Sequence, residues 1–285
     1  MNLNHAHGSL ETQSAMALLL NLPTVLRARA YRLYTKNQRL VDLWLNGGAA
    51  VMGHNPPNLL RELKNTASRG LYAPFPHFTE GRFLKALSKL LPDYNFRIYS
   101  APPQELITLF EKGTAKLWRP FKNPEAPFAA DDNAPLLILV IQGISLWRGG
   151  LPMGLCVTAQ SKRYAQKETA QLPENETLSP VLLATAARGV YDLLTTPERA
   201  KPLLQRIDKI CTQQNANKVC RWQREGIYLT LKEEIKKEEW ETLFKQFLEA
   251  GFLIPPAPSQ PLILPGEMSA GEEIKLAELL ASLLQ

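Results

Sequence analysis

The sequence predicts an α/β fold that ends in a smaller α+β unit. Segments with the apolar spacing of helices alternate with short strand-like runs over most of the chain, an order typical of α/β proteins. Residues 136–145, LLILVIQGIS, begin with a continuous apolar run that is typical of a strand buried on both faces of a parallel sheet. From about Arg224 onward, strand and helix patterns follow one another in an order that indicates an α+β unit.

Composition and charge favour an ordinary soluble protein. The 285 residues are 45% hydrophobic and 21% charged, which allows one large domain or two smaller ones. The net charge is +6, but apart from a loose basic cluster over residues 27–39 the charges are spread along the chain. This distribution argues against a nucleic-acid-binding protein, which would concentrate its cations on one stripe. Phosphate or nucleotide binding by the basic cluster stays a weaker hypothesis.

Three cysteines without CxxC spacing, Cys156, Cys211 and Cys220, argue against a disulfide framework and against a zinc site. We expect reduced cysteines, no metal and a cytoplasmic location. The apolar run over residues 15–26 lacks a basic segment before it and is too short to span a bilayer. We therefore expect no membrane association.

The first half of the chain is expected to contain a hairpin, a short strand and several helices. Asn58 and Gly70 mark the start and end of one helix, Thr79 is a candidate N-cap, and Pro103 is tolerated in a first turn. The expected elements are a helix from about Ser14 to Arg32 that Pro23 interrupts, a hairpin over 31–47, helices over 57–70, 79–92 and 103–121, and a strand over 96–100.

The second half is expected to begin with a Pro- and Ala-rich loop over 122–135. Gly251 is placed to end one helix, and Ser269 with Glu272 has the S-x-x-E spacing of a capping box at the start of another. The expected elements are strands over 136–145, 154–159 and 224–232, two short strand pieces within 252–266, and helices over 179–195, 197–214, 237–251 and 269–285.

Taken in this order, the segments resemble the class III aminotransferases, pyridoxal-phosphate enzymes of fold type I, and most of all the glutamate-1-semialdehyde aminomutases. GGLPMG is similar to the family's G-G-L-P-x-G, and MGHNPP to its G-H-x-x-P turn. The stretches that carry the resemblance are residues 30–64, 95–106, 149–154, 176–194 and 249–280.

The resemblance implies a truncated fold type I large domain and a smaller α+β domain built from N- and C-terminal segments, and it implies a homodimer. The expected divisions are a flexible N-terminal segment (1–26), a hairpin and dimer-type segment (27–75), a shortened large domain (76–200) and a C-terminal small domain (201–285).

In this family a lysine shortly before G-G-L-P-x-G forms an imine with the cofactor, which only an amine can do. An ungapped comparison places Ser145 there, and a comparison with a small insertion places Gln142 there. No lysine lies between Lys122 and Lys162, so neither alignment restores the amine.

Other cofactor contacts of the family are also altered. Its S-G-T phosphate cradle corresponds to Ser100-Ala101-Pro102-Pro103, in which each proline removes an N–H donor. The family's section with the ring-stacking aromatic residue and the ring-pairing aspartate is replaced by the loop over 122–135. Asp131 and Asp132 lie in that loop, without a strand before them to hold either in the aspartate's place.

Thr177 matches a threonine that, in the family, reaches the cofactor phosphate from the partner subunit. Read from the sequence alone, a threonine before a helix is more often an N-cap, and we favour that interpretation. Trp147 and Arg148 bring bulk and charge into the loop where the cofactor would lie, and we expect them to fill the vacated pocket. His54 is interpreted as a turn histidine, and His77 has no partner at a catalytic spacing.

Two hypotheses of function follow. The first is a binding or regulatory pseudoenzyme without transaminase or aminomutase activity, which takes no cofactor and binds an active paralogue or a small metabolite. The second is a pyridoxal-phosphate enzyme with a relocated lysine, either one such as Lys162 or one from the partner chain. Catalytic residues are expected only under the second hypothesis, and Ser100 and Thr177 are the vestigial cofactor contacts.

Overall fold

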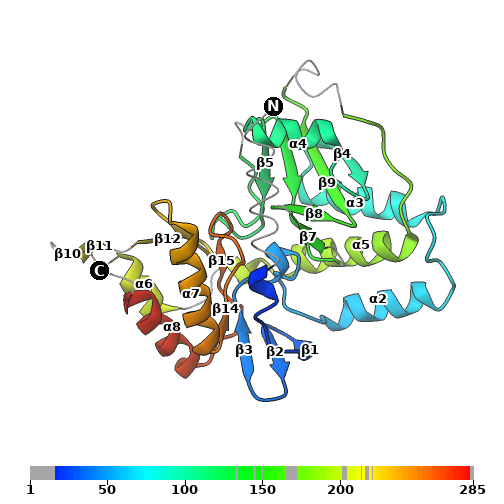
Figure 1. Ribbon diagram of the computed structural model, residues 1–285. Helices are drawn as coiled ribbons and strands as arrows, with labels where there is room; N and C mark the ends of the chain where they lie inside the picture. The colour runs from blue at the N-terminus through cyan, green and yellow to red at the C-terminus, as the bar shows by residue number, and fades with distance from the viewer. Residues whose placement is uncertain are drawn as a thin grey trace. The chain divides into compact units, whose positions relative to one another are not determined.

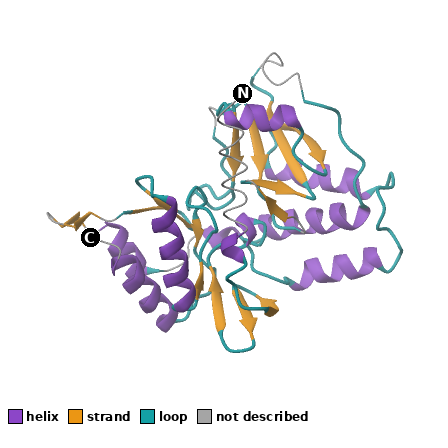
Figure 2. Cartoon of the chain, in the orientation of Figure 1, coloured by secondary structure: helices purple, strands orange, loops and turns teal. Residues whose placement is uncertain are grey.

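The strands and helices of the computed structural model alternate along much of the chain (Figures 1 and 2). The chain divides into two units. The central unit is made of residues 48–50 and 55–197, and the terminal unit of residues 1–47, 51–54 and 198–285. The structure describes residues 17–131, 134–143, 146–148, 150–164, 172–200, 204–212, 214–215, 218–219 and 221–282.

The central unit contains a four-stranded mixed sheet in the order β4-β9-β6-β5. Strand β6 pairs parallel with β5 and antiparallel with β9, which in turn pairs antiparallel with β4. The bounds are β4 (Tyr94–Tyr99), β5 (Ala115–Trp118), β6 (Leu136–Leu139) and β9 (Cys156–Ser161). All four residues of β6 are buried, as its apolar sequence predicts, although only one of its two neighbours is parallel.

Helices cover both faces of this sheet (Figure 1). Leu137 and Leu139 of β6 belong to the core formed with α3 and α5, whereas Leu136 and Ile138 point to the other face, where Leu106 of α4 is buried. This alternation follows from the period-two geometry of a strand. The other elements are η1 (Asn46–Gly48), α2 (Pro57–Ala67), α3 (Thr79–Leu90), α4 (Gln104–Glu111), α5 (Pro180–Leu194), β7 (Leu146–Arg148) and β8 (Leu151–Met153).

The terminal unit has a core of its own, in which Trp222, Trp240 and Phe244 are almost completely buried. Its sheets have the orders β1-β2-β3-β14 and β12-β13-β15, with β10 and β11 forming a separate pair. The bounds are β1 (Val25–Arg29), β2 (Arg32–Thr35), β3 (Arg39–Asp42), η2 (Pro197–Ala200), α6 (Gln205–Thr212), β10 (Gln214–Asn215), β11 (Lys218–Val219), β12 (Trp222–Glu225), β13 (Tyr228–Leu231), α7 (Lys237–Glu249), β14 (Phe252–Leu253), β15 (Leu262–Ile263) and α8 (Ala270–Ser282).

Several local predictions are confirmed. Strands β2 and β3 form the expected hairpin, and Gly70 and Gly251 follow α2 and α7 with positive φ. At the start of α8, the N–H of Ser269 donates to Glu272 Oε2 at 2.9 Å, and the N–H of Glu272 donates to Ser269 Oγ at 3.2 Å. These reciprocal bonds are those of the predicted capping box.

Other local predictions are wrong. The helix expected up to Arg32 is replaced after Pro23 by β1, because this segment pairs with β2 instead of burying a helical face. The helix expected over 103–121 ends at Glu111, because Gly113 takes a φ of 75° and the next residues join the sheet as β5. Helix α3 includes Thr79 as its first residue, and Phe78 is its N-cap.

None of the helices in the described part of the chain is long and apolar enough to cross a membrane.

Candidate functional site

Gln142, one candidate for the lysine position, lies in a tightly packed place just after β6. Gln142 is only 3% exposed, and its main chain lies against Gly189 of α5. A Cβ atom at position 189 would lie 1.9 Å from the carbonyl oxygen of Gln142 and 2.8 Å from its carbonyl carbon. The next residue, Gly143, donates its N–H to the carbonyl oxygen of Ala49 at 3.2 Å. The loop is therefore held on α5 without spare room. Ser145, the other candidate, lies outside the described residues.

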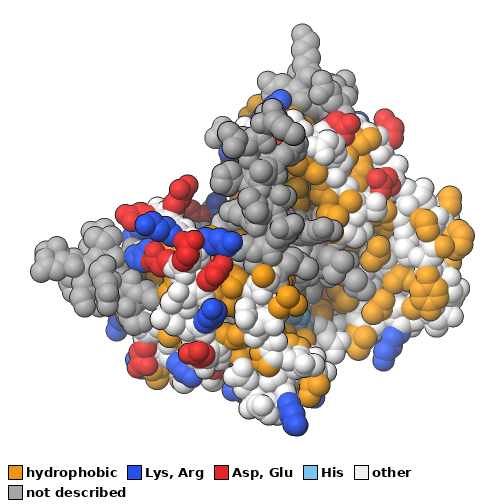
Figure 3. All heavy atoms as spheres, in the orientation of Figure 1, with side chains coloured by type: hydrophobic (Ala, Val, Ile, Leu, Met, Phe, Trp, Pro, Cys, Tyr) orange, Lys and Arg blue, Asp and Glu red, His pale blue; other side chains and the backbone are white. Residues whose placement is uncertain are grey.

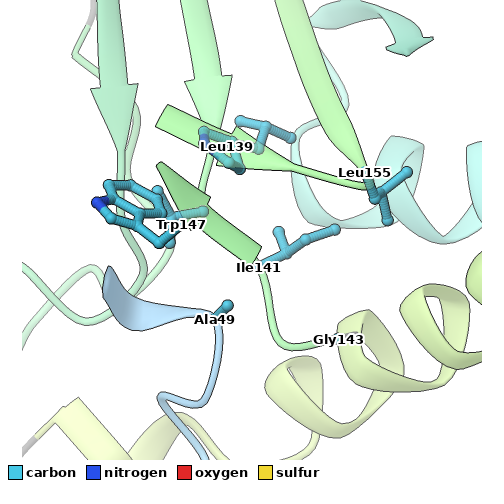
Figure 4. Close-up of a pocket in the computed structure, with 8 residues that line it drawn as sticks. Ala49, Leu139, Ile141, Gly143, Trp147 and Leu155 are labelled. Atoms are coloured by element: carbon cyan, nitrogen blue, oxygen red, sulfur yellow. The ribbon is translucent and has the colours of Figure 1, made fainter. Parts of the chain in front are cut away.

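A small apolar pocket adjoins this loop (Figure 4). Its volume is about 10 Å³, which is room for about one water molecule. Trp147 is one of its walls, is buried, and has the guanidinium of Arg119 5.6 Å from its ring centroid. The burial of Trp147 agrees with the expectation that it fills this place, whereas the side chain of Arg148 is outside the described part. The lining residues are Ala49, Leu139, Val140, Ile141, Gly143, Trp147, Pro152 and Leu155.

The turn at Ser100 is hydrogen-bonded to the carboxylate of Glu176. The N–H of Ser100 donates to Oε2 of Glu176 at 2.7 Å, and its hydroxyl donates to the same oxygen at 2.6 Å. Both distances are typical of charge-assisted hydrogen bonds. The two donors of Ser100 that could face a cofactor phosphate are therefore bound to a carboxylate.

Thr177 follows Glu176 and is exposed. The interpretation of Thr177 as an N-cap is wrong, because α5 begins at Pro180 and Ser179 is its N-cap. Proline is favoured at the first helical position, which places the cap one residue before it. The Ser179 hydroxyl does not cap the helix but donates to the carbonyl oxygen of Leu71 at 3.3 Å.

Two further residues that the sequence brought into question, Asp131 and Lys162, have partners of their own. Asp131 accepts a hydrogen bond from Lys116 Nζ at 2.9 Å at the protein surface, and Asp132 lies outside the described residues. Lys162 donates to the carbonyl oxygen of Pro92 at 2.7 Å. It follows the end of β9 that pairs with Tyr94, whereas Ser100 follows the end of β4 that pairs with Cys156. Five residue steps of strand separate these two ends by about 17 Å.

Cys156 is not a candidate nucleophile. Burial, and to a smaller extent the negative charge of Glu176, raise the pKa of its thiol to about 12. The thiolate is the reactive form, so this cysteine is neutral and inert at physiological pH. The described residues also contain no group of three or more His, Cys, Asp or Glu side chains that could hold a metal ion.

The two histidines in the described part of the chain, His54 and His77, are held by local contacts. His54 Nε2 lies 2.8 Å from Oδ2 of Asp42, whose other oxygen accepts the N–H groups of Trp44 and Leu45. The main chain of His54 pairs with Ala30. His54 therefore supports the turn after β3, as the sequence suggested, with Asp42 as a partner that the sequence did not indicate. His77 Nδ1 lies 3.1 Å from the hydroxyl oxygen of Thr79 at the start of α3.

The described residues at this place do not fit pyridoxal phosphate. The loop after β6 offers a buried glutamine and no amine, the adjoining pocket has room for about one water, and the donors of Ser100 are bound to Glu176. Sequence reasoning missed two residues that decide this, Gly189 and Glu176. A glycine inside an apolar helix is a weak signal of close packing, but the position of Glu176 has no signal in the sequence.

No known family model matches the sequence. An uncharacterized protein of Treponema pallidum (strain Nichols) is 26% identical over 287 residues, which cover 85% of this chain and 88% of that protein. A second uncharacterized protein, from Borreliella burgdorferi, is 31% identical over 115 residues, which cover 39% of this chain and 42% of that protein.

Solved structures of aminotransferases resemble the chain over most of its length. An ornithine aminotransferase from Plasmodium yoelii has a TM-score of 0.62 and 13% identity and covers 96% of this chain and 98% of its own. An omega-transaminase from Sphaerobacter thermophilus has a TM-score of 0.58 and 11% identity, with 98% and 97% covered. At these identities the likeness concerns the fold alone. The chain therefore has an α/β fold of the fold type I aminotransferase kind and resembles the class III aminotransferases in structure.

Proposed function

We propose that the chain is a binding or regulatory pseudoenzyme: an aminotransferase-like protein that takes no pyridoxal phosphate and has no transaminase or aminomutase activity. The observation that carries the proposal is the close contact of the Gln142 main chain with Gly189. A Cβ built at position 189 would lie 1.9 Å from the carbonyl oxygen of Gln142. The buried side chain at this place is a glutamine, which has no amine to form an imine.

Homodimer formation is part of the proposal. The loop between α2 and α3 exposes three aromatic side chains: Tyr72 is 65% exposed, Phe75 50% and Phe78 68%. In Figure 3, hydrophobic side chains gather over this loop at the edge of the central unit. Clustered exposed aromatic residues indicate a protein contact surface. Beyond a second copy of the chain, the binding partners proposed are a related active aminotransferase or a small metabolite.

The alternative, an enzyme with a relocated lysine, has less support. Lys162 lies at the opposite end of its strand pair from Ser100, and a lysine side chain does not bridge about 17 Å of strand. Phosphate or nucleotide binding by the basic cluster over residues 27–39 also has less support. Arg32 and Arg39 both pair with Glu272, at 2.8 and 3.2 Å, so part of the positive charge there is neutralised.

The test is a titration of the purified chain with pyridoxal phosphate, followed by visible absorbance, reduction with borohydride and mapping of modified lysines. We expect no saturable imine band and only slow, scattered modification of surface lysines. Lys162→Arg is the control, and we expect it to behave like the wild type. A saturable band that maps to one lysine would overturn the proposal, and its loss in Lys162→Arg would identify the relocated amine.

The dimer is tested separately by sedimentation equilibrium. We expect the wild type to have the mass of a dimer, and a variant with serine at Tyr72, Phe75 and Phe78 to be monomeric with an unchanged circular dichroism spectrum. A monomeric wild type at micromolar concentration would contradict this part of the proposal and leave the loss of catalysis untouched.

A further inference from the structure

Strand β1 is an end strand of its sheet, with β2 as its neighbour among the described strands (Figure 1). Because hydrogen-bonded and non-hydrogen-bonded positions alternate in an antiparallel pair, alternate residues of β1 direct their main-chain groups away from β2. One point of this edge is already paired. The N–H of Ala30, directly after β1, donates to the carbonyl oxygen of His54 at 3.1 Å, and the N–H of His54 donates to that of Ala30 at 2.5 Å. The rest of the edge is open to a further strand.

Two exposed arginines of β1, Arg27 and Arg29, gather positive charge at this edge. They lie on one face of the sheet, because side chains two residues apart in a strand point to the same side. The guanidinium of Arg27 lies 4.4 Å from the ring centroid of Tyr34 on β2. Arg29 lies directly opposite Arg32, and like charges at opposite positions repel one another. A carboxylate on the open side of β1 would relieve this repulsion.

The carboxylate of Glu272, in the first turn of α8, balances only the inner part of this charge. It pairs with Arg32 of β2 at 2.8 Å and with Arg39 of β3 at 3.2 Å. Within the described part of the chain, no ion pair includes Arg27 or Arg29. The positive charge that the described carboxylates leave unbalanced on this face therefore lies on β1, next to the open edge.

The same strand exposes two apolar side chains: Leu26 is 69% exposed and Val25 40%. Charged residues on an end strand are one means by which proteins prevent association of sheet edges. Here they disfavour a second copy of β1, because its arginines would approach those of the first. An exposed leucine beside them works against such protection. The combination fits an occupant that brings carboxylates to the arginines and apolar side chains to Leu26 and Val25.

We propose that the open edge of β1 binds an extended acidic segment of a partner protein, which joins the sheet as a further strand. Cβ atoms directly opposite one another on neighbouring strands are about 4.5–5.5 Å apart, so carboxylates at alternate positions of the segment reach Arg27 and Arg29 together. Main-chain hydrogen bonds supply affinity, and the arginines and Leu26 select the sequence that binds. This site does not depend on the proposed loss of the cofactor, and either result of the cofactor titration leaves it untouched.

The experiment measures the fluorescence anisotropy of a fluorescein-labelled peptide in which glutamate and valine alternate over seven residues. We expect saturable binding to the purified chain, and binding at least fivefold weaker to Arg29→Glu. Lys36→Glu is the matched control, because Lys36 is an exposed cation in the turn between β2 and β3 and not on β1. We expect it to bind the peptide as the wild type does, within twofold.

A second peptide tests whether a strand is added. The same sequence methylated on every amide nitrogen keeps its side chains and charge but has no main-chain donors. We expect it to bind the wild type at least tenfold more weakly than the unmodified peptide does.

Several outcomes would overturn the proposal. The unmodified peptide could fail to bind, Arg29→Glu and Lys36→Glu could weaken its binding equally, or the methylated peptide could bind as tightly as the unmodified one. Tighter binding of a labelled oligothymidylate would make the edge a nucleic-acid site instead. A change of mass of Arg29→Glu in sedimentation equilibrium would make the occupant a second copy of the chain.

Arg29 is exposed, so Arg29→Glu is expected to keep the native circular dichroism spectrum. If it does not, Arg29→Gln replaces it, because the amide removes the charge without reversing it. That variant is expected to bind the peptide at least threefold more weakly than the wild type, and unchanged binding would equally contradict the proposal.

Discussion

Replacing Gly189 with alanine tests the packing on which the proposed loss of the cofactor site depends. Gly189 is buried in the middle of α5, and the added methyl would lie 1.9 Å from the carbonyl oxygen of Gln142 and 3.2 Å from its Cβ. Non-bonded heavy atoms are at optimal separation at about 3.5 to 4.0 Å. The loop after β6 or the helix must therefore move by about 1.5 Å or more.

The expected cost combines two opposing effects. Overpacking a core costs about 1–3 kcal/mol, while alanine is favoured over glycine inside a helix by about 1 kcal/mol. The obstacle is a main-chain carbonyl held by its neighbours, which places the overpacking cost at the upper end. We therefore expect Gly189→Ala to lower the free energy of unfolding by about 1–2 kcal/mol.

Gly81 provides the matched control. It lies in α3, and no atom lies within 4 Å of a Cβ built there. Gly81→Ala is expected to leave stability unchanged or to raise it by up to about 1 kcal/mol. Urea unfolding followed by tryptophan fluorescence measures both variants, and Trp118 and Trp147 report on the central unit. With a slope of about 2 kcal/mol per molar urea, Gly189→Ala should shift the midpoint down by about 0.5–1 M.

A Gly189→Ala variant as stable as Gly81→Ala would refute the reasoning. It would mean that the main chain at Gln142 does not pack tightly on α5. The central argument against a cofactor at this place would then fail, whatever the titration shows.

Two further predictions concern the terminal unit. Burial works to raise the pKa of Glu272, but hydrogen bonds from Arg32 and Ser269 outweigh it and hold the pKa at about 2, below the ordinary value of 4.5. This carboxylate therefore stabilises the fold above about pH 4.5 and loses that contribution as the pH falls toward 2. After allowance for solvent screening, Glu272→Gln should lower the free energy of unfolding by about 1–2 kcal/mol at pH 7 and make it depend less on pH between pH 5 and 2. Acid titrations in which the wild type and the variant lose stability in parallel would exclude this. Arg199 is 7% exposed and donates to the carbonyl oxygens of Val51 and Leu264. A lysine keeps the buried charge but does not reach both carbonyl oxygens. Arg199→Lys should therefore lower the melting temperature more than Arg199→Met does. The reverse order would show that the charge itself is needed.

The local elements that the sequence predicts correctly are those whose signals lie within a few residues. The hairpin of β2 and β3 needs only a polar turn between two apolar runs, and the Ser269–Glu272 capping box needs only its spacing. The failures occur where a distant partner decides. The segment of β5 has an ambiguous pattern, and its parallel pairing with β6 makes it a strand.

The same distinction between local signals and distant partners applies to the candidate site. The absence of a lysine between Lys122 and Lys162 is a property of the sequence, and it holds for every alignment of the loop. The close packing of Gln142 on α5 is a property of the tertiary structure, because Gly189 and Gln142 are 47 residues apart by their numbers and meet only when α5 packs beside β6. Likewise, Glu176 and Ser100 form a hydrogen bond only because residues 172–178 pack along β4.

By itself, the sequence determined that no lysine lies in the loop between Lys122 and Lys162 and which local elements the chain forms, because side-chain type and short-range spacing are written directly in it. Only the tertiary structure decided what lies where the resemblance places the cofactor contacts: the main chain of Gln142 against α5, Trp147 beside the small pocket, and the Glu176 carboxylate on the Ser100 turn. The physical reason is that packing and hydrogen bonding between distant segments depend on the direction and register of whole elements, which no local pattern specifies.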